Sequence, residues 1–149
     1  MSNYLRAQTE CALENYEFLV SEVKNLIISI EEVEEDYKGC GAMKYDGGVG
    51  SAGKFNSVVE NEVINKDEKI KELRKVLVNK KKMLDRINNA LNVLKDRERS
   101  IIEFRYIKGM NWEQTGQKVD LTAGYCRVLG TKIIDKMAKI IYVDKICIK

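Results

Sequence analysis

The chain contains no histidine, and this absence excludes several kinds of site at once. Without histidine there is no Ser–His or Cys–His pair that could activate a nucleophile. The cysteines do not form a CxxC pair, so the ligand spacing of a zinc site is missing; they are Cys11, Cys40, Cys126 and Cys147. No pair of carboxylates stands out from the solvated faces of helices. We therefore expect no enzymatic activity, no metal and no cofactor.

Long hydrophobic segments are lacking too. No apolar run reaches the roughly 20 residues that a membrane-spanning helix needs, and the N-terminus lacks the apolar core of a secretory signal. We expect a cytoplasmic protein with reduced thiols, with Cys126 in the core and with no membrane partner.

The composition is that of a helical protein of one or two small domains, with 44% hydrophobic and 33% charged residues among 149. Residues 1–60 carry 5 Lys/Arg against 11 Asp/Glu, whereas residues 61–149 carry 21 against 12. The basic part would attract phosphate and the acidic part would repel it. This division suits a protein whose N-terminal half faces something other than DNA, or a pair of hairpin helices that attract each other.

The stretch over residues 95–137 contains three helix starts, each with its own cap. We expect Asp96 to cap the first helix, and Gly109 to provide the left-handed residue that ends it. Asn111 followed by Gln114 predicts a capping box for the second helix. Thr122 is the expected cap of the third, whose apolar face contains Cys126, Leu129, Ile133 and Met137.

A connection of three residues, Val119–Leu121, separates the second and third helices. Such a short connection favours the steep crossing of a helix-turn-helix unit, whose second helix protrudes into a major groove. Gly116 lies where these helices would approach most closely. Asp120 tolerates the positive φ that the turn requires. The alternative is three ordinary core helices of a small bundle.

These residues carry a family resemblance. The pattern comprises Arg97-Glu98-Arg99, Ile102, Arg105-Tyr106, Gly109, Trp112-Glu113, Gly116, Leu121-Thr122, Leu129 and Met137. It resembles region 4 of bacterial sigma factors, which reads a promoter's upstream element. It also resembles the phage-encoded sigma-like regulators of the RinA and ArpU families. The resemblance implies a transcription regulator that binds double-stranded DNA and contacts RNA polymerase. It covers about a third of the chain. After the cap of the third helix, family members carry charged or polar residues where this chain has Ala123 and Gly124 and then Tyr125. A complete sigma factor is excluded because the aromatic-rich promoter-melting region is missing.

The expected DNA contacts lie mainly on the third helix. Arg127 is the candidate for bidentate hydrogen bonding to guanine, and Val128 for contact with a thymine methyl. Thr122 is expected to contact phosphate through the helix N-terminus. The other expected contacts are Ala123, Gly124, Thr131, Lys132 and Lys136, with Arg105, Lys108 and Lys118 from the first two helices. Each basic residue has the alternative of being an exposed solubilising charge, and we expect Tyr106 and Trp112 to belong to the core.

The N-terminal part predicts a long antiparallel coiled-coil hairpin. Residues 3–37 read as one helix and residues 57–95 as another, each with apolar positions at alternating spacings of three and four. Lys66 and Lys80 interrupt the second seam, and we expect them to pair with glutamates of the first helix. The predicted fold is therefore all-α, with a helical hairpin over residues 1–95 and a helix-turn-helix domain over residues 96–149.

The predicted connection over residues 38–56 is rich in glycine. It includes Gly48–Lys54, which fits the GxxxxGK start of a phosphate-binding loop. Phe55 occupies the place of the Mg²⁺-binding Ser or Thr, and no buried strand precedes the loop. A flexible hairpin loop is the better interpretation. Ser57 and Glu60 predict a capping box for the helix that follows.

Further apolar residues widen both seams beyond what a two-helix hairpin covers. They are Val20, Ile27, Val76, Met83 and Ala90. We favour a homodimer through the hairpin over coverage by the C-terminal domain. Two other functions remain open from the sequence: a phage small terminase subunit that recognises packaging DNA, and a coiled-coil scaffold that binds no nucleic acid.

Overall fold

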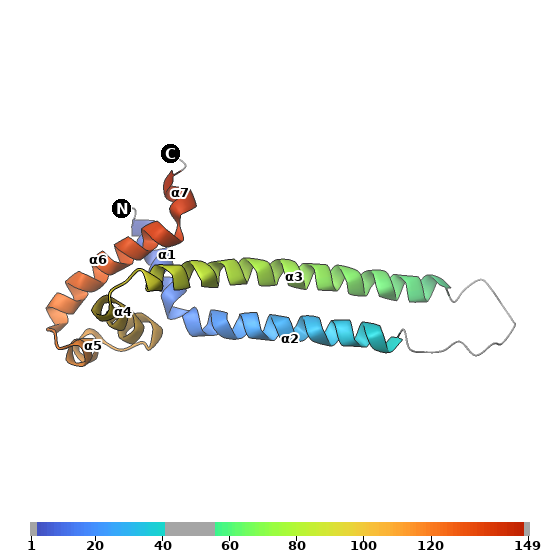
Figure 1. Cartoon of the computed structure of the whole chain (residues 1–149), viewed down its shortest axis with the longest axis horizontal. Coiled ribbons are helices and arrows are strands. Elements are labelled where there is room, and N and C mark those ends of the chain that lie inside the picture. The colour runs from blue at the N-terminus through green and yellow to red at the C-terminus, as the bar shows by residue number, and fades with distance from the viewer. Residues whose placement is uncertain (1–2, 41–55, 148–149) are drawn as a thin grey trace, which may run out of the picture. The chain divides into compact units, whose positions relative to one another are not determined.

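The protein is all-α, as predicted (Figure 1). The computed structural model describes residues 3–40 and 56–147, apart from the side chains of residues 37, 39–40 and 56–60, and this part of the chain contains no strand. The elements are α1 (Asn3–Glu14), α2 (Tyr16–Cys40), α3 (Asn56–Asn92), α4 (Asp96–Ile102), the π-helix η1 (Glu103–Ile107), α5 (Trp112–Val119), α6 (Ala123–Ile141) and α7 (Val143–Cys147). Among these helices none combines the length and hydrophobicity needed to cross a bilayer.

The single helix predicted over residues 3–37 was wrong, because Asn15 separates α1 from α2. The Asn15 side-chain amide donates to the carbonyl oxygen of Cys11 at 2.8 Å, one helical turn earlier. The Cys11 oxygen also accepts from the Asn15 backbone N–H at 3.1 Å, so the side chain competes with the backbone for this acceptor where the helix is interrupted. The apolar seam that predicted the helix begins only at Tyr16, so its spacing gave no sign of a break at the preceding residue.

The chain forms two compact units that do not divide at residue 95, the boundary predicted from the sequence. One unit contains the residues up to Ser21 together with those from Lys81 onward, and we call it the core unit. The other spans Glu22–Lys80, and we call it the two-helix unit. Helix α1 and the last turns of α3 therefore belong with the C-terminal helices.

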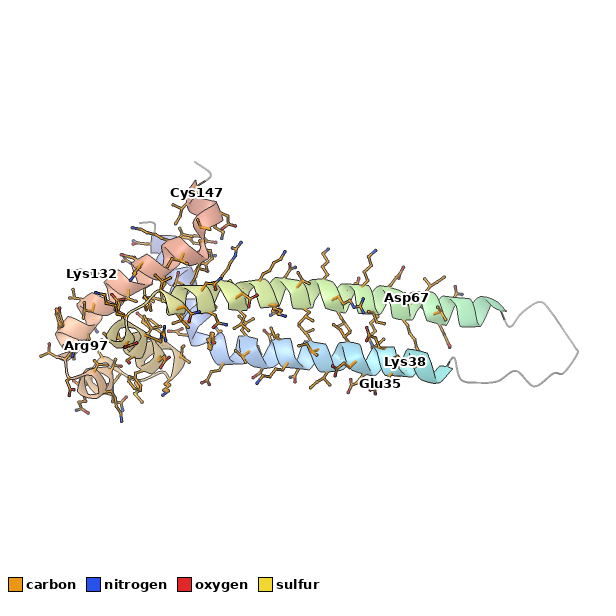
Figure 2. The ribbon with its side chains drawn as sticks, viewed as in Figure 1. Glu35, Lys38, Asp67, Arg97, Lys132 and Cys147 are labelled. Carbon is orange, nitrogen blue, oxygen red and sulfur yellow. The ribbon has the colours of Figure 1, made fainter. Side chains whose placement is uncertain are left out.

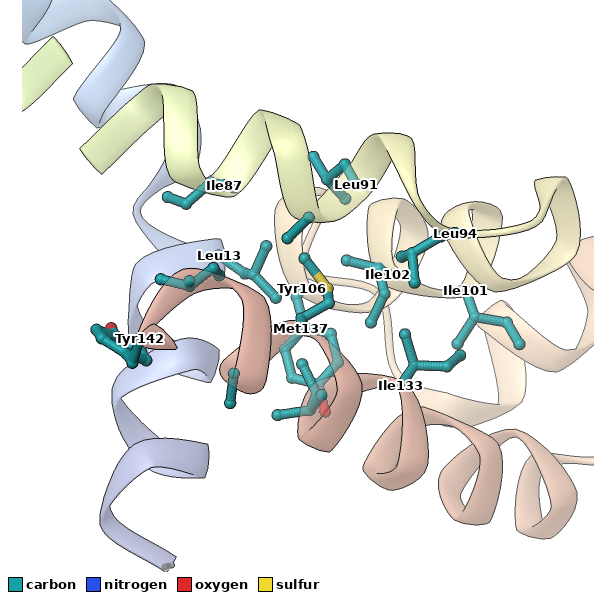
Figure 3. Packing of buried hydrophobic residues seen from close by; sticks show 14 of the residues in the cluster. Leu13, Ile87, Leu91, Leu94, Ile101, Ile102, Tyr106, Ile133, Met137 and Tyr142 are labelled. Carbon is teal, nitrogen blue, oxygen red and sulfur yellow. The ribbon is translucent and has the colours of Figure 1, made fainter. Parts of the chain in front are cut away.

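The core unit is built around large apolar side chains that converge from several helices (Figure 3). Leu13 of α1, Ile87 of α3, Ile101 of α4 and Met137 of α6 are all completely buried. Full burial of such a side chain stabilises the fold by about 1.5–3 kcal/mol. The predicted core position of Cys126 is confirmed, and burial raises the pKa of its thiol. Met83 and Ala90, two residues that widen the α3 seam, pack into this cluster as well.

Polar contacts fix α1 on the surface of this core. The Arg6 guanidinium donates from Nε and Nη2 to the two carboxylate oxygens of Asp135 on α6, at 2.9 and 2.8 Å. The Tyr106 hydroxyl donates to Glu10 at 3.2 Å. A planar two-bond pair such as Arg6–Asp135 restrains orientation as well as distance. Helix α1 is thus oriented against α6 by both packing and charge.

In the two-helix unit, α2 and α3 lie side by side and run in opposite directions (Figure 1). Lys80 donates to Glu22 at 2.7 Å, and Arg74 pairs with Glu34, so residue numbers rise along α2 as they fall along α3. The expected pairing of Lys80 with a glutamate of the first helix is confirmed. Charged side chains cover the exterior, as Figure 2 shows for Glu35, Lys38 and Asp67.

Several predictions concern residues beyond those the structure describes. The glycine-rich connection falls largely in residues 41–55, which include the GxxxxGK segment. The side chains of Ser57 and Glu60, the predicted capping box, also lie outside the described set.

Candidate nucleic-acid interface

The first helix of the predicted DNA-binding segment begins one residue earlier than expected. Lys95, not Asp96, is the N-cap of α4, and its backbone N–H donates to the Glu98 carboxylate at 3.1 Å. This bond, followed by the bond from Lys136, holds the pKa of Glu98 below its usual range. Gly109 follows η1 with φ +68°, which confirms its predicted left-handed conformation.

Arg105 lies in the π-helical turn η1 and packs its half-buried side chain against aromatic residues of the core unit. Its Nη1 donates to the Met110 carbonyl oxygen at 3.0 Å, and its guanidinium lies 5.0 Å from the ring centre of Trp112 and 5.6 Å from that of Tyr106. The Nε atom is buried and has no hydrogen-bond partner among the described residues. A π-helical turn re-aims a side chain in this way. Arg105 is half-buried and already engaged by these contacts, and its expected phosphate contact stays a prediction.

Helix α5 begins at the capping box that the sequence predicted. The Gln114 backbone N–H donates to Asn111 Oδ1 at 2.8 Å, and the Asn111 backbone N–H donates to Gln114 Oε1 at 3.1 Å. These two bonds satisfy two of the free N–H groups at the start of the helix. Thr115 and Val119 are buried, and α5 packs mainly against α6. The start of α5 is therefore fixed locally and its direction by packing.

The turn between α5 and α6 is tight and left-handed. Asp120, at its first position, has φ +55°, as predicted. The chain then passes so close to α5 that a Cβ on Gly116 would lie 2.5 Å from the Leu121 carbonyl oxygen. The clash would be with backbone atoms, which cannot turn aside. Gly116 is thus required by the close approach of the turn to α5.

Helix α6 divides into an exposed beginning and a buried remainder. The Tyr125 backbone N–H donates to Thr122 Oγ1 at 3.3 Å, which confirms Thr122 as the cap. The first turns expose Gly124, Arg127 and Val128, and Val128 retains 52% of its accessible surface. The later turns are buried through Ile133, Ile134, Met137, Ala138 and Ile141. The core unit therefore encloses the second half of α6, whereas the first half is buried on one face, through Cys126 and Gly130, and exposed on the other.

A second glycine, Gly130, sets the distance between α5 and α6, and sequence reasoning missed it. A Cβ there would lie 2.5 Å from Cη2 of Trp112. The Trp112 ring has little room to move, because Arg105 lies over it and Tyr106 packs edge-on against it at 6.1 Å. A glycine in mid-helix costs stability relative to alanine, which was the available signal.

The basic residues around this exposed helix start differ in their surroundings. Lys118, Arg127 and Lys132 are exposed, and Figure 2 shows Lys132 on α6. Lys108 is exposed as well, with its ammonium 4.8 Å from the ring centre of Phe104. Lys136 donates to Glu98 at 3.2 Å. Of the remaining predicted contacts, Thr122 is exposed, whereas Ala123 and Thr131 are half-buried.

Comparison with protein families gives a match over nearly the whole chain. A family model described as a protein of unknown function (DUF722) matches residues 5–139. The chain belongs to the DUF722 family. Neither the curated proteins nor the solved structures gave a match to the chain. The DUF722 match runs through every residue from Arg105 to Lys136 and includes α1 from Leu5 onward.

In this DUF722 chain the exposed start of α6 includes an aromatic residue that sequence reasoning left out. Tyr125 retains 54% of its accessible surface beside Gly124. The apolar spacing identifies buried positions well, but it does not say which large residues between them stay exposed. Across the described part of the chain, no cluster of three or more acidic, cysteine or histidine side chains suits a metal ion.

Proposed function

We propose that the chain is a DNA-binding transcription regulator in which α5, the turn at Asp120 and α6 act as a helix-turn-helix. The observation that carries this proposal is that α6 is enclosed through its second half, while its first turns are buried only through Cys126 and expose Gly124, Arg127 and Val128. A recognition helix needs both properties, since it must be held rigidly and must also enter the major groove. The tight left-handed turn supports the same assignment.

The exposed beginning of α6 offers chemistry suited to base edges. The Arg127 guanidinium is exposed and can donate two parallel hydrogen bonds to N7 and O6 of guanine. Val128 can contact a thymine methyl group. Gly124 leaves no side chain between the helix backbone and the duplex, and Thr122 positions the helix N-terminus toward a phosphate. Arg127 is the residue that would distinguish one base sequence from another.

Phosphate contacts are assigned to Lys108, Lys118 and Lys132, which are exposed. Lys136 would contribute only by leaving or sharing Glu98. Arg105 is assigned a structural role instead, because its guanidinium packs against Trp112 and Tyr106.

The resemblance to sigma region 4 supports regulation of transcription beside RNA polymerase. Of the positions that carry it, Gly109 has a left-handed backbone that favours glycine, and Gly116 lies where the close approach of the turn requires it. Thr122 caps α6, as a recognition-helix cap would. We also propose that α2 and α3 form an antiparallel coiled-coil hairpin. The ion pairs Lys80–Glu22 and Arg74–Glu34 support this assignment.

Binding of the purified chain to random-sequence duplexes at several salt concentrations tests the proposal. We expect the logarithm of the association constant to fall linearly with the logarithm of salt concentration, because each neutralised phosphate releases counterions. Lys118→Gln should reduce the slope by about one unit. Lys139→Gln, an exposed lysine of α6 outside the proposed set, is the matched control. No binding at low salt would refute the proposal.

A further inference from the structure

One face of the two-helix unit combines exposed apolar residues with opposite charges on its two helices. Residues three, four or seven apart share a face of a helix. On α2, Ile27 therefore shares a face with Glu31 and Glu34. On α3, Arg74 shares a face with residues 71 and 78, and the Arg74–Glu34 ion pair joins the two faces into one. We call this the Ile27–Val78 face.

The apolar part of this face remains exposed. Ile27 retains 40% of its accessible surface, Val78 48% and Ile64 53%. Ile64 belongs to the face because it precedes Lys71 by seven residues. The two ion pairs show that Glu22 is level with Lys80 and that Glu34 is level with Arg74. Ile27 lies between these two glutamates on α2. It is therefore level with the stretch of α3 between Arg74 and Lys80, which contains Val78. Ile27 and Val78 thus form the apolar centre of the face.

The charges on the two helices are opposite at the same level of the unit. Residues 31–36 of α2 contain five acidic residues, and residues 69–75 of α3 contain four basic residues and one acidic one. The Arg74–Glu34 pair uses one charge from each group. Glu31 and Lys71 remain exposed on the Ile27–Val78 face. A partner for this face should therefore present an acidic helix beside a basic one.

We propose that the partner is a second copy of this chain, bound through the Ile27–Val78 face. Two copies can meet face to face with the two-fold axis along the helices or across them. An axis across the helices would place α2 on α2 and α3 on α3, which loses the attraction between the acidic stretch of one copy and the basic stretch of the other. An axis along the helices places α2 of one copy on α3 of the other. Ile27 of each copy then meets Val78 of the other, and Glu31 meets Lys71.

This dimer goes beyond the proposed DNA binding, and its test needs no DNA. The mass of the full chain in solution should be twice the 17.1 kDa of one chain. We expect Ile27→Glu to weaken association about tenfold or more, because it places a charge at the centre of the interface. Val76→Glu is the matched control, because Val76 is similarly exposed, at 44%, but lies on the other side of α3. Circular dichroism should show both variants to be as helical as the unaltered chain.

A charge exchange tests the pairing of α2 with α3 directly. Glu31→Lys and Lys71→Glu should each weaken association several-fold, because each turns two attractive contacts into repulsive ones. An equal mixture of the two variants should restore the dimer, since both contacts become attractive again. A monomer at the highest protein concentrations, a ring of many subunits, or a mixture that fails to associate would overturn the proposal. Dissociation by Val76→Glu with Ile27→Glu unaffected would overturn it as well.

Discussion

The core unit and the two-helix unit are both helical, but they are stabilised differently. In the core unit, Leu13, Ile134 and Met137 are completely buried. In the described residues of the two-helix unit, the most buried hydrophobic side chains are Val23 and Ile30, each 8% exposed, while the α3 seam is only half-buried. Several helices can enclose a side chain, whereas two helices can only cover one stripe of each other. The core unit should therefore respond to lost packing, and the two-helix unit to changes of charge.

The difference matters for the proposed function. A recognition helix must keep its geometry while it binds, and α6 is held by the fully packed unit. Burial of its second half would fix the direction in which Arg127 points. The two-helix unit, with its exposed apolar residues, is better suited to association than to precise positioning.

The largest expected effect comes from Leu13, which tests whether α1 belongs to the core unit. Leu13→Ala should lower the free energy of unfolding by about 3 kcal/mol, because it leaves a cavity among fully buried side chains. The matched change Leu73→Ala, in the half-buried seam of α3, should cost about 1 kcal/mol. Denaturant unfolding, monitored by hydrogen exchange, measures the free energy of unfolding of both variants. Equal costs would mean that the two units are packed alike.

The turn between α5 and α6 should be nearly as sensitive. Gly116→Ala should cost about 2 to 3 kcal/mol, because the new Cβ would meet the Leu121 carbonyl oxygen at 2.5 Å. Gly124 has no atom within 4 Å of a Cβ position, so Gly124→Ala should be neutral or stabilising. Thermal unfolding of both variants checks this contrast. A neutral Gly116→Ala would show that the turn is looser than described.

A smaller, pH-dependent effect should come from the Arg6–Asp135 pair of the core unit. The hydrogen bonds from Arg6 hold the pKa of Asp135 below its usual range. The folded chain therefore binds fewer protons than the unfolded chain near pH 4, so the pair's contribution is complete above the usual aspartate pKa. The contribution of the pair to stability is lost as the pH falls through the lowered pKa of Asp135.

Urea unfolding across the acidic range tests this sign. The deficit in free energy of unfolding that Asp135→Asn shows relative to the unaltered chain should shrink as the pH falls below about 4. Arg6→Gln should show the same trend, since it removes the same bonds. A deficit that stays constant through this range would show that the pair does not stabilise the fold through ionised Asp135.

The smallest expected effect concerns the exposed ion pair of the two-helix unit. Arg74→Gln should reduce stability by about 0.2–1 kcal/mol, because the Arg74 and Glu34 side chains retain 63% and 38% of their accessible surface. The loss should disappear in high salt. An effect that persists in high salt would point to packing of the Arg74 stem instead.

Local features of the fold could be predicted from the sequence. The Asn111–Gln114 box, the Thr122 cap and the left-handed Gly109 and Asp120 depend on residues within a few positions of each other. A short stretch of sequence is therefore enough to predict these features. The same holds for burial of Cys126, which follows from helical spacing.

Long-range features could not be predicted in this way. The apolar seam that begins at Tyr16 carries no sign of the break at Asn15, and Leu13 fits an amphipathic helix whether it faces α3 alone or the whole core. Likewise, Arg105 looked like an exposed cation, because the π-helical turn that directs it toward Trp112 has no clear sequence signal. Such residues are decided by contacts between distant segments.

The most direct test of the central claim is the effect of Arg127→Ala on duplexes selected from a random pool for tight binding by the unaltered chain. Arg127→Ala should cost about 1 to 3 kcal/mol of binding free energy on the selected duplex and little on random DNA. Lys139→Ala, on the same helix, should change neither affinity appreciably. An equal loss on selected and random DNA would contradict the assignment of α6 as the helix that reads bases.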